Sequence, residues 1–311
     1  MNFKNNERNS TSLDIVINAF NVKPLVIDCL ESIYKQKGKN DNWKVIVADM
    51  ASKDGTVAAV RKKFPQTIVL ASKHDLGFSK GNNFARSTVK AKNVLFLNPD
   101  TKIVGDVIQK TLSILEDRKE LGAIGCKVML PTGKLDYSCH RGLPTIWNSF
   151  CHFSGLSKIF PKTKYFAGYE ATHLDYNQSH EIDCITGAYL MIRKKILDKI
   201  NWWDEDYFWN GEDVEMCYRV KRLGYKIWYE ASVTIMHFKG SSSGLYKTAK
   251  LQVPKEEKIG RARDSTRSMR IFIQKHFSEL GPAPVVALAW IGAWILEQYR
   301  LAKIELGLKY A

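Results

Sequence analysis

The N-terminal part of the chain alternates short apolar runs with stretches of helical periodicity. The runs at 13–18, 45–49, 67–71 and 94–97 are rich in Val, Ile and Leu, as expected for strands buried in a parallel sheet. Segments with helical periodicity follow the first three runs, at 24–34, at 57–64, and after Asn83 to near Lys90. This alternation predicts an α/β unit whose parallel strands are joined by right-handed crossovers.

The alternation is lost between Gly122 and Tyr176. A strand is predicted at 123–130 and a turn at 131–133. The region 147–169 is rich in aromatic residues, Lys and Gly and has no clear period. It is interpreted either as an insert that faces an acceptor or as a plain loop.

Order returns at 181–193, and a segment that is both acidic and aromatic follows at 202–219. Glu212 and Asp213 fall in the first turn of a predicted helix, where acidic residues favour the helix dipole. That explanation accounts for two acids at most. The aromatic residues before them can bury a carboxylate and shape a sugar-sized pocket. Two more strands are predicted at 225–229 and 232–236.

Polar side chains gather where the predicted strands end. The run at 94–97 stops at Pro99, so Asp100 lies just beyond the carboxyl end of a central strand, where open α/β sheets bind ligands. A carboxylate beside the amide of Asn98 suits a divalent cation that bridges to a phosphate. Similar residues follow the other strands: Asn18, Asn21, Asp49, Asp54, Asp75 and Asn82. Helix caps and turns explain each one singly, but four such loops on one edge predict a cleft for a base, a ribose and a diphosphate.

Two further positions are candidates for the site. Gly187 allows close approach of a ligand or of another backbone segment. His237 ends an apolar run before a Gly/Ser-rich loop, which makes it a candidate metal ligand as well as a candidate structural histidine. The chain contains neither a G-x-G-x-x-G fingerprint nor a phosphate-binding P-loop.

Charge and cysteine content narrow the class of protein. The net charge of +15 predicts an anionic partner: nucleic acid, a phosphorylated substrate or a cytoplasmic membrane surface. The six cysteines have no disulfide or zinc spacing and are expected to be reduced and mostly buried. The polar residues 1–12 do not resemble a signal peptide, and the sequence lacks an apolar stretch of about 18 to 20 residues. A cytoplasmic protein is therefore expected.

The C-terminal part has a different character. Residues 247–275 hold nine basic and three acidic residues and predict a surface helix or arm. Residues 283–296 are apolar and include two tryptophans, but as a helix they would span only about 21 Å of a hydrocarbon core about 30 Å thick. They predict either a helix that lies in the interface of an anionic membrane or a helix that packs on the catalytic unit.

Six motifs, in this order, resemble those of glycosyltransferase family 2 with its GT-A fold, especially the rhamnosyltransferase-like members. They are VINAFN at 16–21, DMASKDGT at 49–56, GFSKGNN at 77–83, LNPD at 97–100, WDEDYF at 203–208 with Glu212 and Asp213, and HFKGSS at 237–242. The resemblance implies a nucleotide-diphospho-sugar transferase fold, with a Rossmann-like, mixed and mostly parallel sheet between helices. We expect a polar tail at 1–12, a catalytic domain at 13–245 and a helical extension at 246–311.

The same resemblance implies an inverting, metal-dependent transferase. Its site would comprise nucleotide-sugar contacts, two metal ligands and two acids. The expected nucleotide-sugar contacts are Asn18, Asn21, Asp49, Ser52, Asp54, Gly77, Phe78, Gly81, Asn82, Asn98 and Gly187. Asp100 and His237 would bind Mg²⁺ or Mn²⁺, Asp213 would be the general base, and Glu212 would position the acceptor. Three residues depart from the family pattern: Met50 and Asp75 replace usual asparagines, and Asn98 is uncharged in the D-x-D position.

The resemblance favours dTDP-L-rhamnose as donor, with UDP-sugars as the second choice, and a glycan or lipid-linked acceptor used in cell-surface polysaccharide synthesis. The protein would lie at the inner face of the cell membrane. Two alternatives remain, a nucleotidyltransferase on a similar sheet and a non-enzymatic protein that binds anionic ligands. No nucleic acid partner is expected, because no helix-turn-helix, zinc-finger or RNA-binding motif is present.

Overall fold

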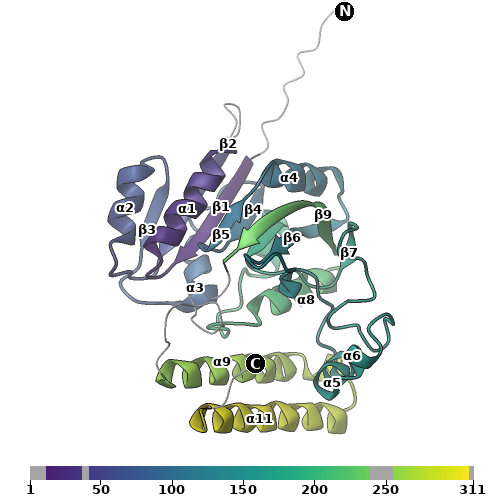
Figure 1. Ribbon diagram of the computed structural model, residues 1–311. Helices are drawn as coiled ribbons and strands as arrows, with labels where there is room; N and C mark the ends of the chain where they lie inside the picture. Colours follow the sequence, from purple (N-terminus) through teal and green to yellow (C-terminus); the bar gives the residue numbers. More distant parts are fainter. Residues whose placement is uncertain (1–11, 37–41, 239–254, 308–311) are drawn as a thin grey trace, which may run out of the picture.

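Nine strands form one mixed sheet in the computed structural model, which describes residues 12–36, 42–238 and 255–307 (Figure 1). Their order is β3-β2-β1-β4-β8-β6-β9-β5, and β7 pairs with β9 outside this path. The strands are β1 Ser12–Ala19, β2 Asn42–Asp49, β3 Ile68–Ala71, β4 Asn93–Leu97, β5 Thr101–Ile103, β6 Leu121–Met129, β7 His180–Ile182, β8 Tyr189–Arg193 and β9 Lys226–His237.

Helices flank the sheet, and two long ones follow it in the chain. The helices of the sheet-containing part are α1 Lys23–Tyr34, α2 Thr56–Lys63, α3 Gly77–Asn83, α4 Val107–Asp117, α5 Ile146–Ser154, α6 Leu156–Ile159, α7 Lys194–Lys199 and α8 Glu212–Arg222, with a short 3₁₀ turn at Tyr137–Cys139. The C-terminal helices are α9 Lys255–Lys275, α10 Phe277–Leu280 and α11 Ala283–Glu305. The predicted α/β class, with a mixed sheet between helices and a helical C-terminal extension, is confirmed.

The four N-terminal strands are parallel, as predicted, and their register brings their carboxyl ends to one edge. Ala19 of β1 lies opposite Asp49 of β2, and Asp49 lies opposite Ala71 of β3. On the other side of β1, Ile17 lies opposite Leu97 of β4. The loops after β1, β2 and β4 therefore start close together, which is the arrangement that a ligand site requires.

The core is centred on β4, whose five residues are all buried. Its neighbour β8 is antiparallel and begins the second half of the sheet. Phe96 of β4 packs edge-on against Trp202 and Trp203, with ring centroids 6.1 and 4.9 Å away. The aromatic residues that precede α8, within 202–209, thus pack against the central strand.

Three local predictions differ from the structure. The predicted helix after Asn83 instead lies inside the motif as α3, because Asn82 bonds within the motif and the Asn18 side chain of β1 donates to its backbone carbonyls. The two predicted strands at 225–229 and 232–236 form the single strand β9, whose register against β6 shifts next to Cys126. A register shift of this kind lets one strand continue although the apolar pattern is interrupted between 229 and 232. The region without a clear period contains α5 and α6.

The C-terminal helices form a separate layer (Figure 1). Helix α9 lies between the sheet-containing part and α11, and it contacts α11 along its length. On α11 only Val286, Ala293 and Ile304 are buried, so this helix covers the molecule from outside and does not enter its core. Within the described ranges, every helix is too short or too polar to cross a membrane. Residues 1–11 of the tail predicted at 1–12, the loop at 239–243 and the boundary near 245 lie outside the described residues.

Candidate functional site

Asp49, at the end of β2, is only 1% exposed. Its Oδ1 accepts a hydrogen bond of 2.9 Å from the Ser52 amide. Its Oδ2 is buried and has no hydrogen-bond partner among the described residues. A buried acceptor without a partner costs free energy, so a ligand N–H or O–H at this oxygen would remove that cost.

Asn21 and Asp54 connect the loops around Asp49. Asn21 has a left-handed backbone (φ 52°), its amide donates to Ser52 Oγ (2.8 Å), and its Oδ1 accepts from the Lys53 amide (2.8 Å). Asp54 accepts from the Lys23 amide with one oxygen and from Thr56 with the other. These predicted contact residues therefore shape the first two loops into one surface.

A second group of predicted residues holds α3 onto β1. Asn18 Nδ2 donates to the carbonyls of Gly77 (2.9 Å) and Phe78 (3.2 Å), and Asn82 Nδ2 donates to Phe78 O (2.9 Å). A methyl group at Gly81 would lie 2.5 Å from Asn18 Nδ2. The small residue at 81 is thus required for the close approach of α3 to the end of β1.

The structure brings the two predicted metal ligands together. Asp100 is 4% exposed, and its Oδ1 lies 3.2 Å from His237 Nε2. The other ring nitrogen, Nδ1, lies 3.0 Å from Asp136 Oδ2. Burial disfavours a charged imidazole, but hydrogen bonds and the charges of Asp100 and Asp136 outweigh it and raise the pKa of His237 to about 9. Sequence analysis missed Asp136, which lies 101 positions from His237.

Asp100 and His237 fit a cation shared with a diphosphate better than a closed protein cage. No group of three or more His, Cys, Asp or Glu side chains among the described residues is arranged to hold a metal ion. Mg²⁺ is usually bound through one or two carboxylates together with substrate phosphates and waters. A carboxylate that fixes the distal ring nitrogen, as Asp136 does, is typical of histidines that bind metals. Asn98 lies beside Asp100, and its amide donates to Ala188 O at 3.2 Å.

The acids at the start of α8 have different surroundings. Asp213 Oδ2 accepts from Arg141 Nη2 at 2.9 Å and from the Gly187 amide at 3.3 Å. Glu212 is buried, and its Oε2 has no hydrogen-bond partner among the described residues. Burial, followed by the charge of Asp213, raises the pKa of Glu212 to about 8. Asp213 is thus ion-paired with Arg141, whereas the surroundings of Glu212 favour its protonated form.

Aromatic side chains lie between these acids and the edge of the sheet where β1, β2 and β4 end. Phe78 packs edge-on against Trp203 with centroids 5.1 Å apart, and its amide donates to Phe208 O at 2.9 Å. A methyl group at Gly187 would lie only 3.1 Å from Phe78 Cζ. Asn83 bonds to the Trp203 backbone in both directions, at 2.9 and 3.1 Å. The aromatic residues predicted to line the pocket therefore contact α3. A residue larger than Gly at 187 would crowd the Phe78 ring.

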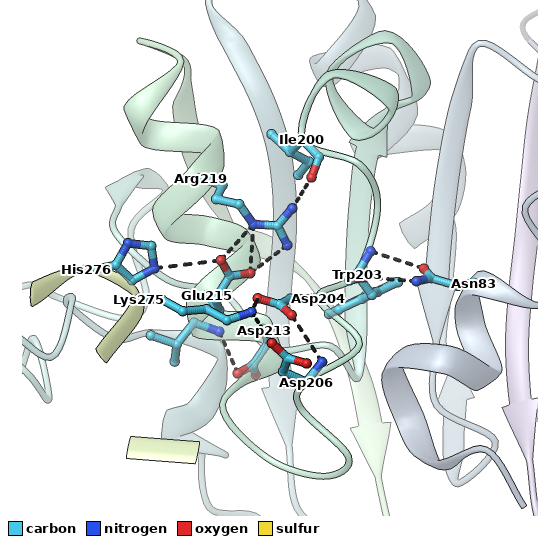
Figure 2. Close-up of polar contacts among 11 residues, drawn as sticks. Asn83, Ile200, Trp203, Asp204, Asp206, Asp213, Glu215, Arg219, Lys275 and His276 are labelled. Atoms are coloured by element: carbon cyan, nitrogen blue, oxygen red, sulfur yellow. Dashed lines mark hydrogen bonds and ion pairs between the residues drawn. The ribbon is translucent and has the colours of Figure 1, made fainter. Parts of the chain in front are cut away.

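The C-terminal layer also reaches this region (Figure 2). Lys275, at the end of α9, lies 2.5 Å from Asp204 and 2.6 Å from Asp206, in the loop that precedes α8. Next to it, His276 faces Glu215 of α8 at 3.7 Å. The acidic loop is visible in the sequence but its partner is not, because Lys275 lies 71 positions from Asp204. The available signal is an acidic cluster in a basic chain, which favours a cation nearby.

The chain is similar to known proteins in its sequence and in its fold. The profile of a family described as "Glycosyltransferase like family 2" matches residues 11–252. An N-acetylglucosaminyl-diphospho-decaprenol L-rhamnosyltransferase of Mycobacterium tuberculosis is 25% identical over 211 residues, covering 64% of this chain and 68% of the relative. Rhamnosyltransferase WbbL of Escherichia coli is 23% identical over 209 residues, covering 64% and 74%.

Among solved structures, the mannosyltransferase PcManGT from Pyrobaculum calidifontis, in complex with GDP-Man and Mn²⁺, has a TM-score of 0.57. It is 16% identical, and the match covers 94% of this chain and 73% of that chain. At this identity the likeness shows a shared fold. Together with the sequence relatives, it favours sugar transfer over the nucleotidyltransferase and non-enzymatic alternatives.

Proposed function

Because the chain belongs to glycosyltransferase family 2, we propose that it moves a sugar from a nucleotide-diphosphate donor to a hydroxyl group of a glycan or lipid-linked acceptor, with inversion at the sugar carbon. The observation that carries this proposal is the setting of the partly buried Asp213. Its carboxylate is ion-paired with Arg141 and accepts a hydrogen bond from the Gly187 amide. Next to it lies the contact between Trp203 and Phe78 of α3, at the edge where β1, β2 and β4 end.

The donor nucleotide would lie over the ends of β1 and β2. The partnerless Oδ2 of Asp49 suits the N3–H of a pyrimidine or a ribose hydroxyl. The loops fixed by Asn21, Ser52 and Asp54 form the walls around that oxygen. Thymidine and uridine both present such a donor, so both nucleotides fit this contact.

The diphosphate would lie toward Asp100 and His237, which would hold Mg²⁺ or Mn²⁺. Such a cation would offset the negative charge that develops on the leaving diphosphate. The residues themselves supply a buried carboxylate and an imidazole whose orientation Asp136 fixes. For His237 Nε2 to act as a ligand, that nitrogen must be deprotonated.

In the transfer step, Asp213 takes the proton of the acceptor hydroxyl. That oxygen forms a bond to C1 of the sugar from the face opposite the diphosphate, while the bond from C1 to the diphosphate oxygen breaks. Arg141 keeps the carboxylate oriented before the proton arrives. Protonated Glu212 can donate a hydrogen bond to an acceptor oxygen, which supports a positioning role. General-base catalysis of this kind contributes about 10² to 10⁴ in rate.

We propose dTDP-L-rhamnose as the first donor and UDP-sugars as the second. The two relatives with rhamnosyltransferase names support the first choice. One relative's name also gives a decaprenol-linked substrate, which supports a lipid-linked acceptor at the inner face of the membrane. We further propose a catalytic domain at 13–245 and an extension at 246–311 that associates with anionic membrane.

The outer face of α11 supports this membrane association. Leu288, Ile291, Ile295 and Tyr299 are exposed and lie on the face opposite the buried Val286, Ala293 and Ile304. From 281 to 296 the sequence has no charged residue. A helix with this pattern is suited to lie in the plane of the bilayer interface, with its apolar face at the boundary between headgroups and acyl chains.

The proposed activity is tested by donor hydrolysis and transfer assays across nucleotide sugars, with Mg²⁺, with Mn²⁺ and with EDTA. Turnover of dTDP-rhamnose or a UDP-sugar that Asp213→Asn reduces by about 10² or more is the expected result. Equal turnover by the wild type and by Asp213→Asn would contradict the proposed mechanism.

A further inference from the structure

A second apolar surface lies within the sheet-containing part of the chain. It is formed by α5, α6 and the residues that follow, 146–166, which we name the aromatic segment. Its large apolar side chains are exposed: Trp147 39%, Phe150 55%, Ile159 67%, Phe160 45% and Tyr165 64%. Scattered exposed apolar residues are ordinary, but a contiguous group marks an interaction site.

The aromatic segment is a built structure rather than a loose loop. The rings of Trp147 and Tyr165 lie 4.9 Å apart, and those of Phe160 and Phe166 lie 4.8 Å apart. Trp147 Nε1 donates a hydrogen bond of 2.7 Å to Tyr165 O. These contacts hold the rings in place while leaving their outer faces exposed, so the surface is preformed for a partner.

The charge around these rings indicates which partner fits. Between Asp136 and Glu170 the sequence contains no acidic residue. Lys158, Lys162 and Lys164 are exposed among the aromatic side chains. Aromatic rings flanked by lysines match the boundary between anionic headgroups and acyl chains. A second copy of this chain fits poorly, because a symmetric contact would bring lysines to face lysines.

The aromatic segment adjoins the outer layer of the molecule. Helix α5 contacts α11, and Figure 1 shows α5 and α6 at the end of α11 where that helix begins. That end of α11 is also its uncharged half, with Val285 and Leu288 exposed. The exposed rings and the apolar helix are therefore neighbours in space, although more than a hundred residues separate them in the sequence.

We propose that the aromatic segment and the outer face of α11 together form one surface that lies on an anionic bilayer, so that the membrane holds the catalytic unit directly as well as through its extension. This inference rests on the proposed function, which places only the C-terminal extension on the membrane. The aromatic segment follows shortly after Arg141, the partner of Asp213, and the Gly142 amide donates to Tyr169 O (2.8 Å) across its base. Docking there brings the general base toward acceptors that are anchored in lipid.

The test uses the full chain and vesicles made of equal parts phosphatidylglycerol and phosphatidylcholine, with phosphatidylcholine vesicles for comparison. The double variant Phe150→Ser, Ile159→Ser removes two exposed apolar side chains. Because both side chains would lose their contact with the acyl chains, we expect the partition coefficient in co-sedimentation to fall about tenfold or more. The matched control is Val104→Ser, an exposed residue between β5 and α4, for which no change is expected.

Replacing Lys158, Lys162 and Lys164 by Ser should weaken binding to the phosphatidylglycerol vesicles and leave the weaker binding to phosphatidylcholine unchanged. Nucleotide-sugar hydrolysis without vesicles should be equal in all variants, which shows that they are folded. Unchanged partition of the Phe150→Ser, Ile159→Ser variant would overturn the inference. A loss of binding that occurs only with Leu288→Ser and Ile295→Ser on α11 would also overturn it while leaving the proposed function intact.

Two other outcomes separate this inference from its premises. Sedimentation of the wild type as a dimer that Phe150→Ser dissociates would overturn it in favour of a contact between two copies. Conversely, absence of hydrolysis with every nucleotide sugar would contradict the proposed activity, whereas the expected loss of vesicle binding would still support the surface.

Discussion

At the scale of single residues, the site places two adjacent acids in contrasting surroundings. Asp213 is paired with a guanidinium, whereas Glu212 is buried beside that negative charge with an oxygen lacking a partner among the described residues. One helix start thus supplies both a proton acceptor and a proton donor. The sequence predicted that both acids lie in the first turn of α8. It could not predict their difference, because Arg141 comes from a segment 72 positions away.

We predict that Asp213→Asn lowers kcat by about 10² to 10⁴, because the amide cannot accept the acceptor's proton. Donor affinity, measured by calorimetry with the nucleoside diphosphate, should stay nearly constant because the side chain keeps its shape. Glu212→Gln is the matched comparison and should mainly raise the KM for the acceptor. Near-normal turnover of Asp213→Asn together with an inactive Glu212→Gln would reverse the two roles.

The raised pKa of Glu212 also predicts how stability depends on pH. In the unfolded chain this carboxyl ionises near its ordinary value of 4.5, whereas in the fold it keeps its proton to about 8. Its contribution to stability is therefore fully present below about pH 4.5 and is lost as pH rises to about 8. Glu212→Gln cannot ionise and escapes that loss.

The Tm difference between Glu212→Gln and the wild type should accordingly grow in favour of the variant between pH 5 and pH 8, and level off above it. Thermal unfolding in a series of buffers measures this, and other groups cancel in the difference. A difference that stays constant across the series would show that Glu212 is ionised in the folded protein.

The metal ligands give a further residue-scale prediction. Asp136 fixes the ring of His237, so Asp136→Asn should weaken divalent-cation affinity about 10- to 100-fold, as is typical for such partners. Calorimetry of dTDP or UDP with Mg²⁺ should show a matching loss of cation-dependent binding, and Asp100→Ala should lose more. Equal nucleotide affinity in Mg²⁺ and in EDTA for the wild type would argue against the metal role.

At the scale of elements, local patterns predicted most strands and the edge that carries the site. The four N-terminal strands were predictable because each contains a short apolar run, and Asn or Asp marks the end of that run in β1, β2 and β4. Helix α3 was misplaced because Phe78 is its single apolar side chain, and bonds from Asn18 rather than apolar periodicity hold it. Helices α5 and α6 were missed because their apolar residues are exposed.

We predict that Lys275 links the C-terminal layer to the acidic loop before α8. Lys275→Met should increase hydrogen exchange of residues 203–209, because Asp204 and Asp206 lose their cation. The change in global stability should be small, about 1 kcal/mol or less, since the pair is partly exposed. Lys255→Met is the matched control, because that residue pairs with Glu305 on α11 and leaves the loop untouched.

If exchange of 203–209 is the same in Lys275→Met and in Lys255→Met, the ion pairs do not order the loop.

The contact between the C-terminal layer and α8 also affects how a deletion of the extension should be designed. Phe272 and His276 pack on Tyr218 of α8, so removal of the extension would expose part of the catalytic unit. Point variants on the outer face of α11 therefore test membrane binding more cleanly than truncation does.

At the scale of the whole molecule, the net charge of +15 and the apolar outer face of α11 predict two separable contributions to binding on anionic vesicles. Attraction to the charged surface acts over about one Debye length, roughly 10 Å at 0.1 M salt and 3 Å at 1 M. Insertion of apolar side chains is not screened in this way. Binding should therefore fall with rising salt to a plateau rather than to zero.

That plateau identifies the contribution of α11. Ile291→Ser with Ile295→Ser should lower the high-salt plateau in vesicle co-sedimentation, because both side chains lie on the exposed face. Arg263 and Arg267, exposed on α9, offer the complementary change. Their replacement by Gln should reduce binding at low salt and leave the plateau unchanged. Binding that vanishes at high salt in the wild type would mean that charge alone holds the protein on the vesicle, and that α11 covers α9 without entering the bilayer.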